Sequence, residues 1–197
     1  MISLELKLKQ HSELGPPREL NVLVPLLSWT LNFLTLLISP FRLRSENCIT
    51  WAVNNIRSIF NKLVYFHAVL SSHNLDIICI TKSWLNSSFP NSLFSLPNYN
   101  VFRFDRSTRG GGVILFISSK FKAKPIAIPA EFSDIELVCV DISFGYTVFR
   151  IIGYYRPPGF DTDDCWYEPS SVKALAYLYS TRHLCMLLGD FNLPDID

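Results

Sequence analysis

Seven short apolar segments constrain the fold of this chain more than any other feature of its sequence. Six of them are rich in β-branched or aromatic residues, the last is made mainly of Leu, Met and Cys, and Gly, Pro, Asn or Asp lie at or next to their ends, which is the pattern of a β-strand. The segments lie at 48–54, 75–81, 101–104, 111–118, 135–142, 147–155 and 184–190. Within "DIICIT" the four residues "IICI" are apolar without interruption, so we expect that strand to be buried.

Two other segments have the spacing of amphipathic helices. The second is expected at about 169–182, before the last strand. The first follows Ser58, which we expect to cap it, and its apolar stripe consists of Ile59, Leu63, Phe66 and Leu70. The order strand, helix, strand, then a block of strands, then helix and strand predicts an α/β fold, a layered β-sandwich flanked by helices.

Composition limits the classes of protein to consider. The 197 residues fit one domain, and 49% are hydrophobic, which excludes a disordered tail. A net charge of +1 excludes a protein that holds nucleic acid by overall charge alone, so any such binding must be local. Five cysteines form no CxxC pair, which indicates a reduced, intracellular protein, nuclear or cytoplasmic.

The N-terminal part raises the question of a membrane anchor. Residues 22–41 are uncharged over a length that spans a bilayer, and Arg42 and Arg44 follow them. Pro25, Asn32 and several hydroxyl residues argue against a spanning helix. We expect residues 1–45 to be an apolar extension outside the domain and residues 46–197 to form the domain, with membrane association the less favoured alternative.

Polar residues follow three of the predicted strands. The last strand ends in "GDFN", which delivers Asp190 and Asn192 at its tip, where α/β sheets place ligand sites. Asn55 comes just after the first strand, and Tyr155 and Arg156 end the strand "IIGYYRPPG". Each motif alone is also explained as an ordinary turn or as packing at the end of a strand.

Taken in order, these motifs, together with "DRSTRGGGV", resemble the endonuclease/exonuclease/phosphatase superfamily. More narrowly, residues 48–197 look like the apurinic-type endonuclease domain of jockey-like non-LTR retrotransposons. The resemblance implies two packed sheets flanked by helices, and Mg²⁺-dependent hydrolysis of phosphodiester bonds, used to nick target DNA. It implies no small-molecule cofactor other than the metal.

The resemblance also implies roles for individual residues. Asn55 corresponds to a residue near metal and phosphate, and Tyr155 to a tyrosine on the phosphate side. Asp190 corresponds to the residue that orients or activates the attacking water, and Asn192 to one that binds phosphate or metal. Arg109 lies in the "RGGGV" turn, where we expect a mainly structural role. Together with Arg156 it is a candidate for binding phosphate or DNA.

Lys82 departs from the pattern of the family, which has a glutamate at this position as a principal Mg²⁺ ligand. A protonated ammonium has no lone pair to offer a metal. At about 4 Å and an effective dielectric constant of about 20 it also repels a divalent ion by about 8 kcal/mol before screening. We therefore expect Mg²⁺ binding and hydrolysis to be impaired, although a lysine is competent to hold a phosphate directly.

A second departure is that no Ser-Asp-His motif follows "GDFN", so we expect the domain to be incomplete at its C-terminus. The first interpretation is accordingly an inactive copy of a retrotransposon endonuclease domain. The alternatives are a metal-free module that binds nucleic acid through Lys82, Arg106, Arg109 and Arg156, or a membrane-anchored fragment.

Overall fold

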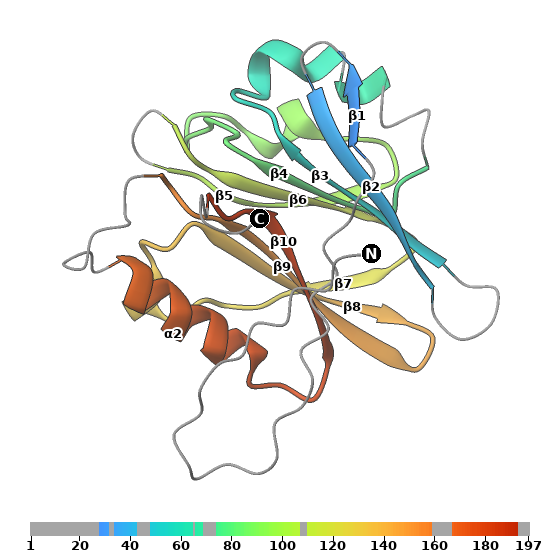
Figure 1. The fold of residues 1–197 in the computed structure, drawn as a ribbon. Coiled ribbons are helices and arrows are strands. Elements are labelled where there is room, and N and C mark those ends of the chain that lie inside the picture. The colour runs from blue at the N-terminus through green and yellow to red at the C-terminus, as the bar shows by residue number, and fades with distance from the viewer. Residues whose placement is uncertain are drawn as a thin grey trace, which may run out of the picture.

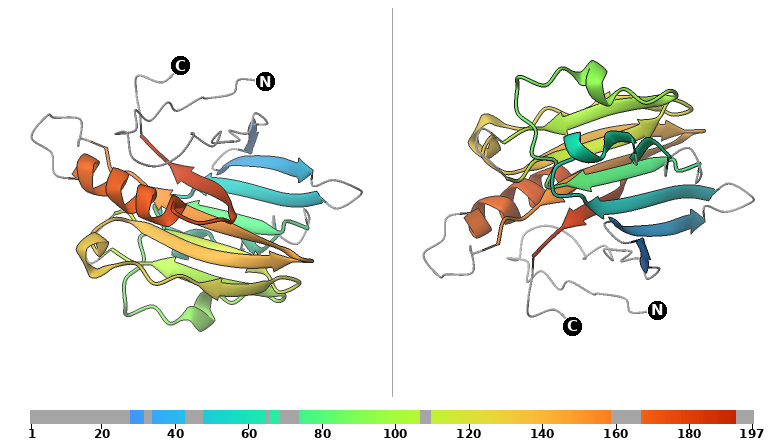
Figure 2. Two further views of the ribbon diagram at one scale, coloured as in Figure 1. Left: turned by 90° about the horizontal axis from the view of Figure 1, so that it is seen from below. Right: turned by 90° about the horizontal axis from the view of Figure 1, so that it is seen from above.

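Two β-sheets pack face to face and form the centre of the molecule (Figure 1). The structure is a computed structural model that describes residues 28–31, 34–42, 48–64, 66–68, 74–106, 110–158 and 167–192. The first sheet has the order β1-β2-β3-β4-β6-β5 and the second has the order β10-β9-β8-β7. Figure 2 shows the two sheets from two further sides, with helix α2 on the outer face of the second.

The strands of the first sheet are β1 (Ser28–Leu31), β2 (Leu34–Arg42), β3 (Cys48–Asn55), β4 (Ile77–Thr81), β5 (Tyr99–Phe104) and β6 (Val113–Ser118). Those of the second sheet are β7 (Lys122–Pro125), β8 (Leu137–Phe144), β9 (Thr147–Tyr155) and β10 (Leu184–Asp190). The helix α2 spans Tyr167–Tyr179, and short 3-10 helices lie at η1 (Phe60–Lys62), η2 (Asn91–Phe94) and η3 (Ala130–Phe132).

The space between the sheets is filled by alternate residues of the central strands. On β4 the side chain of Cys79 faces the second sheet, where it belongs to the same cluster as Val140 and Ile151. Its neighbours Ile78 and Ile80 belong to a separate cluster on the outer face of the first sheet. Because side chains alternate across a strand, a continuous apolar run is what a strand covered on both faces requires.

The outer face of the second sheet is covered by α2. Ala174 and Leu178 of the helix share a buried cluster with Leu137 and Ile152 of the sheet. Such packing of a helix on a sheet removes apolar surface of both elements from water.

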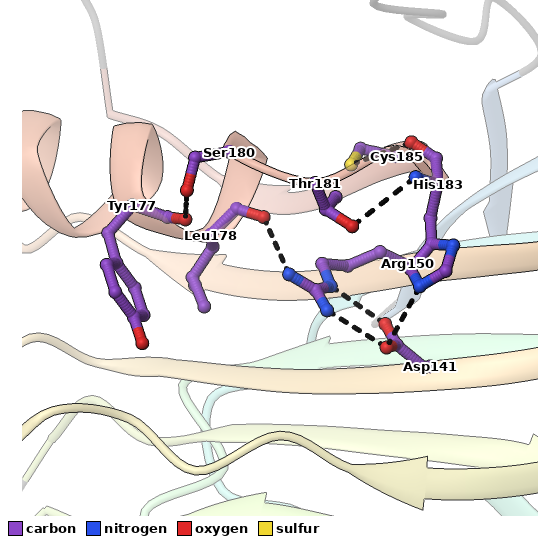
Figure 3. Close-up of polar contacts among 8 residues, drawn as sticks. All are labelled: Asp141, Arg150, Tyr177, Leu178, Ser180, Thr181, His183 and Cys185. Carbon is purple, nitrogen blue, oxygen red and sulfur yellow. Dashed lines mark hydrogen bonds and ion pairs between the residues drawn. The ribbon is translucent and has the colours of Figure 1, made fainter.

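Polar contacts anchor the C-terminal end of α2 (Figure 3). The guanidinium of Arg150 donates to both carboxylate oxygens of Asp141 on the neighbouring strand, at 2.7 and 2.9 Å. Its third bond, of 2.9 Å, goes to the carbonyl of Leu178. The last carbonyls of a helix have no partner within the helix, so Arg150 satisfies one of them and ties α2 to the sheet.

The predicted fold class is confirmed, since two sheets are layered with helices as expected. All seven predicted strands are present, and the helix expected at about 169–182 is shifted to Tyr167–Tyr179. The sequence did not indicate β7, which is short and carries two lysines and a proline.

The helix expected after Ser58 is present in part: a 3-10 helix at Phe60–Lys62 is followed by α-helical residues at 63–64 and 66–68, and Ile59, Leu63 and Phe66 of the expected stripe pack in one cluster. The expected cap is wrong, because Ser58 has φ of 74° and the 3-10 helix has Ile59 as its N-cap without a side-chain hydrogen bond. Leu70 lies outside the described residues. In the part expected to be an extension, residues 28–31 and 34–42 form β1 and β2, and β2 pairs antiparallel with β3, while the division at residue 45 stays a prediction. Within the described part of the chain, no helix has the length and apolar character needed to span a membrane.

Candidate functional site

Four strands end at the same end of the sandwich, and this brings the predicted site residues together. In the first sheet β3 and β4 are parallel, and Asn55 lies opposite Thr81, the residue before Lys82. In the second sheet β9 and β10 are parallel, and Tyr155 lies opposite Asp190. Parallel strands carry their C-terminal residues to one edge, which explains how positions far apart in sequence converge.

The carboxylate of Asp190 is the centre of this site. Its Oδ2 atom accepts a hydrogen bond of 2.6 Å from Nδ2 of Asn55 and lies 3.1 Å from Nζ of Lys82. The side chains of Lys82 and Asp190 are 16% and 21% exposed, and Asn55 is exposed. The ion pair is therefore partly shielded from water, yet open to a ligand.

Lys82 is held in place by the backbone around it. It adopts φ of 55°, and its carbonyl accepts a hydrogen bond of 2.9 Å from the amide of Ser58. Its ammonium also lies 5.3 Å from the centre of the Tyr155 ring, within the range of a cation–π contact. The side chain of Lys82 thus points into the space between the sheets, toward Asp190 and Tyr155.

Tyr155 is a protonated hydrogen-bonding group in this site. Burial raises the pKa of its hydroxyl to about 12, and the negative charges of Glu136 and Asp190 act in the same direction. Arg106 and a hydrogen bond with the Asn192 side chain oppose this rise in pKa. At neutral pH the phenol therefore keeps its proton.

Asn192 and Arg156 hold the turn after β10. The Nη1 atom of Arg156 donates to the carbonyl of Asn192 at 2.7 Å, and Nδ2 of Asn192 donates to the carbonyl of Arg156 at 2.5 Å. Arg156 is only 5% exposed. Its visible contacts therefore support the loop that carries Asn192, whereas its predicted role in binding phosphate or DNA stays a prediction.

Glu136 is a buried carboxylate beside this site that the motif comparison did not single out. Its Oε2 atom accepts a hydrogen bond of 2.5 Å from the amide of Gly112, and its Oε1 atom lies 3.5 Å from Nη1 of Arg106. Burial raises the pKa of this carboxyl group. At Gly111, where φ is 62°, a Cβ atom would overlap the Glu136 carboxylate, which explains the glycine. Arg109 lies outside the described residues.

The donor set at this site does not fit Mg²⁺, which prefers several oxygen ligands in octahedral geometry. Of Asn55, Lys82, Tyr155 and Asp190, only Asp190 is a carboxylate, and its Oδ2 atom is already paired with an ammonium and an amide. Across the described residues, no three His, Cys, Asp or Glu side chains are grouped so as to hold a metal ion. The site carries instead the donors that suit an anion: an ammonium, an amide and a phenol.

The layered sheets define the class of the protein as the endonuclease/exonuclease/phosphatase fold. Among solved structures, the chain is similar to a 3′ phosphatase from Neisseria bound to a product DNA hairpin, with 22% identity and a TM-score of 0.55. It is also similar to an AP endonuclease from Archaeoglobus fulgidus, with 21% identity and a TM-score of 0.54. The matches cover 75% and 74% of this chain and 58% of each of those chains.

A third similar structure belongs to the narrower branch that the motifs indicated. It is the endonuclease domain of TRAS1, a telomere-specific non-LTR retrotransposon, with 13% identity and a TM-score of 0.54. The match covers 74% of this chain and 61% of that one, so the chain spans roughly three fifths of the length of these structures. The sequence matches no protein-family model and no curated protein.

Proposed function

We propose that this chain is a nuclease-fold domain that holds a DNA phosphate at the Asp190 site, and that its metal-dependent hydrolysis is impaired. The fold and its similarity to nucleases support DNA as the partner. The observation that carries the proposal is the Lys82–Asp190 ion pair of 3.1 Å. In it, a fixed ammonium takes the position that the family's pattern gives to a metal-binding glutamate.

Lys82 is suited to a phosphate because an ammonium has three donors and Asp190 occupies only part of that capacity. The exposed side-chain amide of Asn55 donates a hydrogen bond to the same Asp190 carboxylate. Tyr155 places a neutral phenol ring next to the Lys82 ammonium. A phosphate oxygen that approaches from solvent therefore meets several donors at one end of the sandwich. The half-buried Asp190 and the buried Glu136, both negatively charged, keep the local charge balance close to neutral, which limits non-specific attraction.

Hydrolysis has weaker support than binding. Metal-assisted cleavage of a phosphodiester needs activation of water together with neutralisation of charge on the phosphate. Asp190 is placed to accept a proton, but its carboxylate is paired with Lys82, and an ammonium does not replace the activation of water by a metal. An active endonuclease remains the second candidate, because Asn55, Tyr155, Asp190 and Asn192 keep the residue types of the motif.

The test is DNA binding by the full chain, measured by fluorescence anisotropy at several salt concentrations, with EDTA and with Mg²⁺. We expect salt-dependent binding that is equal in EDTA and Mg²⁺, and no nicking of supercoiled plasmid. Lys82→Gln should weaken binding and reduce the slope of log K against log salt by about one.

The matched control is Lys122→Ala, an exposed lysine at the opposite end of the second sheet, where it pairs with Ser143. This variant should bind like the wild type. Plasmid nicking by the wild-type chain would favour the active endonuclease, and equal losses from Lys82→Gln and Lys122→Ala would show that the binding is not at this site. The proposal also implies a nuclear or cytoplasmic location, which fractionation of a tagged chain would test.

A further inference from the structure

Two exposed aromatic residues belong to the two chain segments that carry Asn55 and Lys82 to the Asp190 site. Phe60 is 49% exposed and Trp84 is 36% exposed. Trp84 lies two positions after Lys82 in the chain, and Phe60 belongs to the short helix that follows the loop after Asn55. We refer to Phe60 and Trp84 together as the aromatic patch.

The backbone places the two segments of the aromatic patch side by side. The amide of Ser58 donates to the carbonyl of Lys82 at 2.9 Å, and that of Ile59 donates to the carbonyl of Ser83 at 3.1 Å. Each exposed aromatic residue is also next in sequence to a fully buried one, since Ile59 is 0% and Leu85 is 1% exposed. The aromatic patch is thus fixed to the same two segments that carry Asn55 and Lys82.

Contacts behind the aromatic patch hold it rigid. The ring of Phe60 lies 5.4 Å from that of Phe89, and Phe89 lies 6.3 Å from the buried Phe94. The amide of Trp84 donates to the carbonyl of Gly111 at 3.0 Å. A rigid aromatic surface loses little conformational entropy when another ring stacks on it.

The backbone conformation of these segments is unusual for their residue types. Arg57 and Trp84 have φ of 48° and 57°, in the left-handed region that bulky residues seldom adopt. Such conformations persist where the surrounding structure enforces them, and they concentrate at functional sites. Lys62 is part of that structure, because its Nζ atom donates to the carbonyls of Ile56 and Arg57.

The charge next to the aromatic patch suits a nucleic acid. Arg57 is exposed, and Lys82 lies on the other segment. Cations that follow the backbone, together with aromatic rings on which bases stack, are how proteins hold single strands without reading their sequence. Bases in a continuous duplex are stacked on one another and do not present a face to such a ring.

We propose that the aromatic patch stacks an unpaired DNA base beside the phosphate held at the Asp190 site. This inference rests on the proposed function and adds a preference to it. The domain binds single-stranded or locally unpaired DNA more tightly than a continuous duplex. The occupant is an unpaired base, because the exposed Arg57 and Lys82 lie on the same two segments as the exposed rings and supply cations for the adjoining phosphates.

The experiment compares a fluorescently labelled oligodeoxythymidylate with a duplex of the same length, each titrated with the full chain. We expect the wild type to bind the single strand more tightly. Phe60→Ala and Trp84→Ala should each weaken single-strand binding by about tenfold, within the range for loss of one stacked base. Their binding to the duplex should change by less than about twofold. Trp84→Tyr, which keeps an aromatic face, should retain most of the affinity.

The matched control is Tyr146→Ala, because Tyr146 is a fully exposed aromatic residue in the turn between β8 and β9, at the far end of the sandwich. It should leave both affinities unchanged. Salt-dependent binding without a preference for the single strand, or equal effects of Tyr146→Ala and Trp84→Ala, would overturn the inference that the aromatic patch stacks a base. Either result would leave the proposed function standing. Absence of binding to either DNA would overturn the proposed function and, with it, this inference, and would point to a protein partner for the exposed rings.

Discussion

Lys82 is the residue on which the functional account depends. The sequence shows it as a lone cation after an apolar strand, at a position where the resemblance to the endonuclease/exonuclease/phosphatase superfamily implies a glutamate. Its partner could not be predicted from local sequence, because Asp190 is brought to it only by the packing of the two sheets. Asn55, Tyr155 and Asp190 were expected near one another, and the structure brings them together, while their roles stay predictions.

Glu136 shows what the motif comparison missed. A single acidic residue inside the apolar run "IELVCV" was a usable signal, since a buried carboxylate requires partners. The partners themselves, the amide of Gly112 and the guanidinium of Arg106, come from a distant turn, so the sequence alone did not identify them.

Replacement of Tyr155 with phenylalanine should change how stability depends on pH. The hydroxyl has a pKa of about 12 in the folded chain against 10.0 without the fold, so the folded state retains a proton that the unfolded state loses. Stability from this group is present below pH 10 and is lost as the pH rises toward 12. Urea unfolding at several pH values should therefore show a steeper decline above pH 10 for the wild type than for Tyr155→Phe. Parallel declines would show that the hydroxyl titrates normally.

At the scale of elements, sequence patterns were most reliable where burial decides the structure. The seven apolar strands were predicted because the spacing and type of their apolar residues reflect which faces of each strand are buried in the sandwich. β7 was missed since a short strand with two lysines and a proline has no such pattern. β2 was missed because its apolar run, which includes Pro40, resembled a leader segment. Its pairing with β3 is a tertiary contact, which a local sequence pattern does not reveal.

Gly189 limits how β10 pairs with β9. It lies opposite Tyr154, and a Cβ atom at Gly189 would overlap the Tyr154 carbonyl. Because that neighbour is backbone, it cannot move aside cheaply, and Gly189→Ala should lower the free energy of unfolding by more than about 3 kcal/mol. The measurement is urea denaturation. Gly145→Ala is the control, because nothing lies within 4 Å of a Cβ atom built at Gly145. Only its φ of 59° is unfavourable for alanine, so we expect Gly145→Ala to lower the free energy of unfolding by about 1–2 kcal/mol. Equal losses would contradict the account.

The contact between Arg150 and Asp141 should stabilise the docking of α2. Asp141→Ala removes two of the three hydrogen bonds described for the half-buried guanidinium of Arg150 and leaves the one to the Leu178 carbonyl. We therefore expect the free energy of unfolding to fall by about 2–3 kcal/mol. Thermal denaturation followed by circular dichroism would measure it. Ser143→Ala, at an exposed position of the same strand, should change stability by less than about 0.5 kcal/mol. A loss no larger than that control would show that the ion pair does not contribute.

At the scale of the whole molecule, the sandwich is a frame that carries the ends of β3, β4, β9 and β10 to one place. The fold alone does not decide the function. In the proposed function, Lys82 is the residue that separates a metal-free phosphate site from a metal-dependent nuclease site.

The most direct test of this claim is a thermal melt of the full chain, with and without Mg²⁺ or Mn²⁺, for the wild type and Lys82→Glu. A ligand that binds only the folded state raises its melting temperature. We predict no rise for the wild type, and a rise for Lys82→Glu, where a second carboxylate joins Asp190. A rise of the wild-type melting temperature equal to that of the variant would contradict the account.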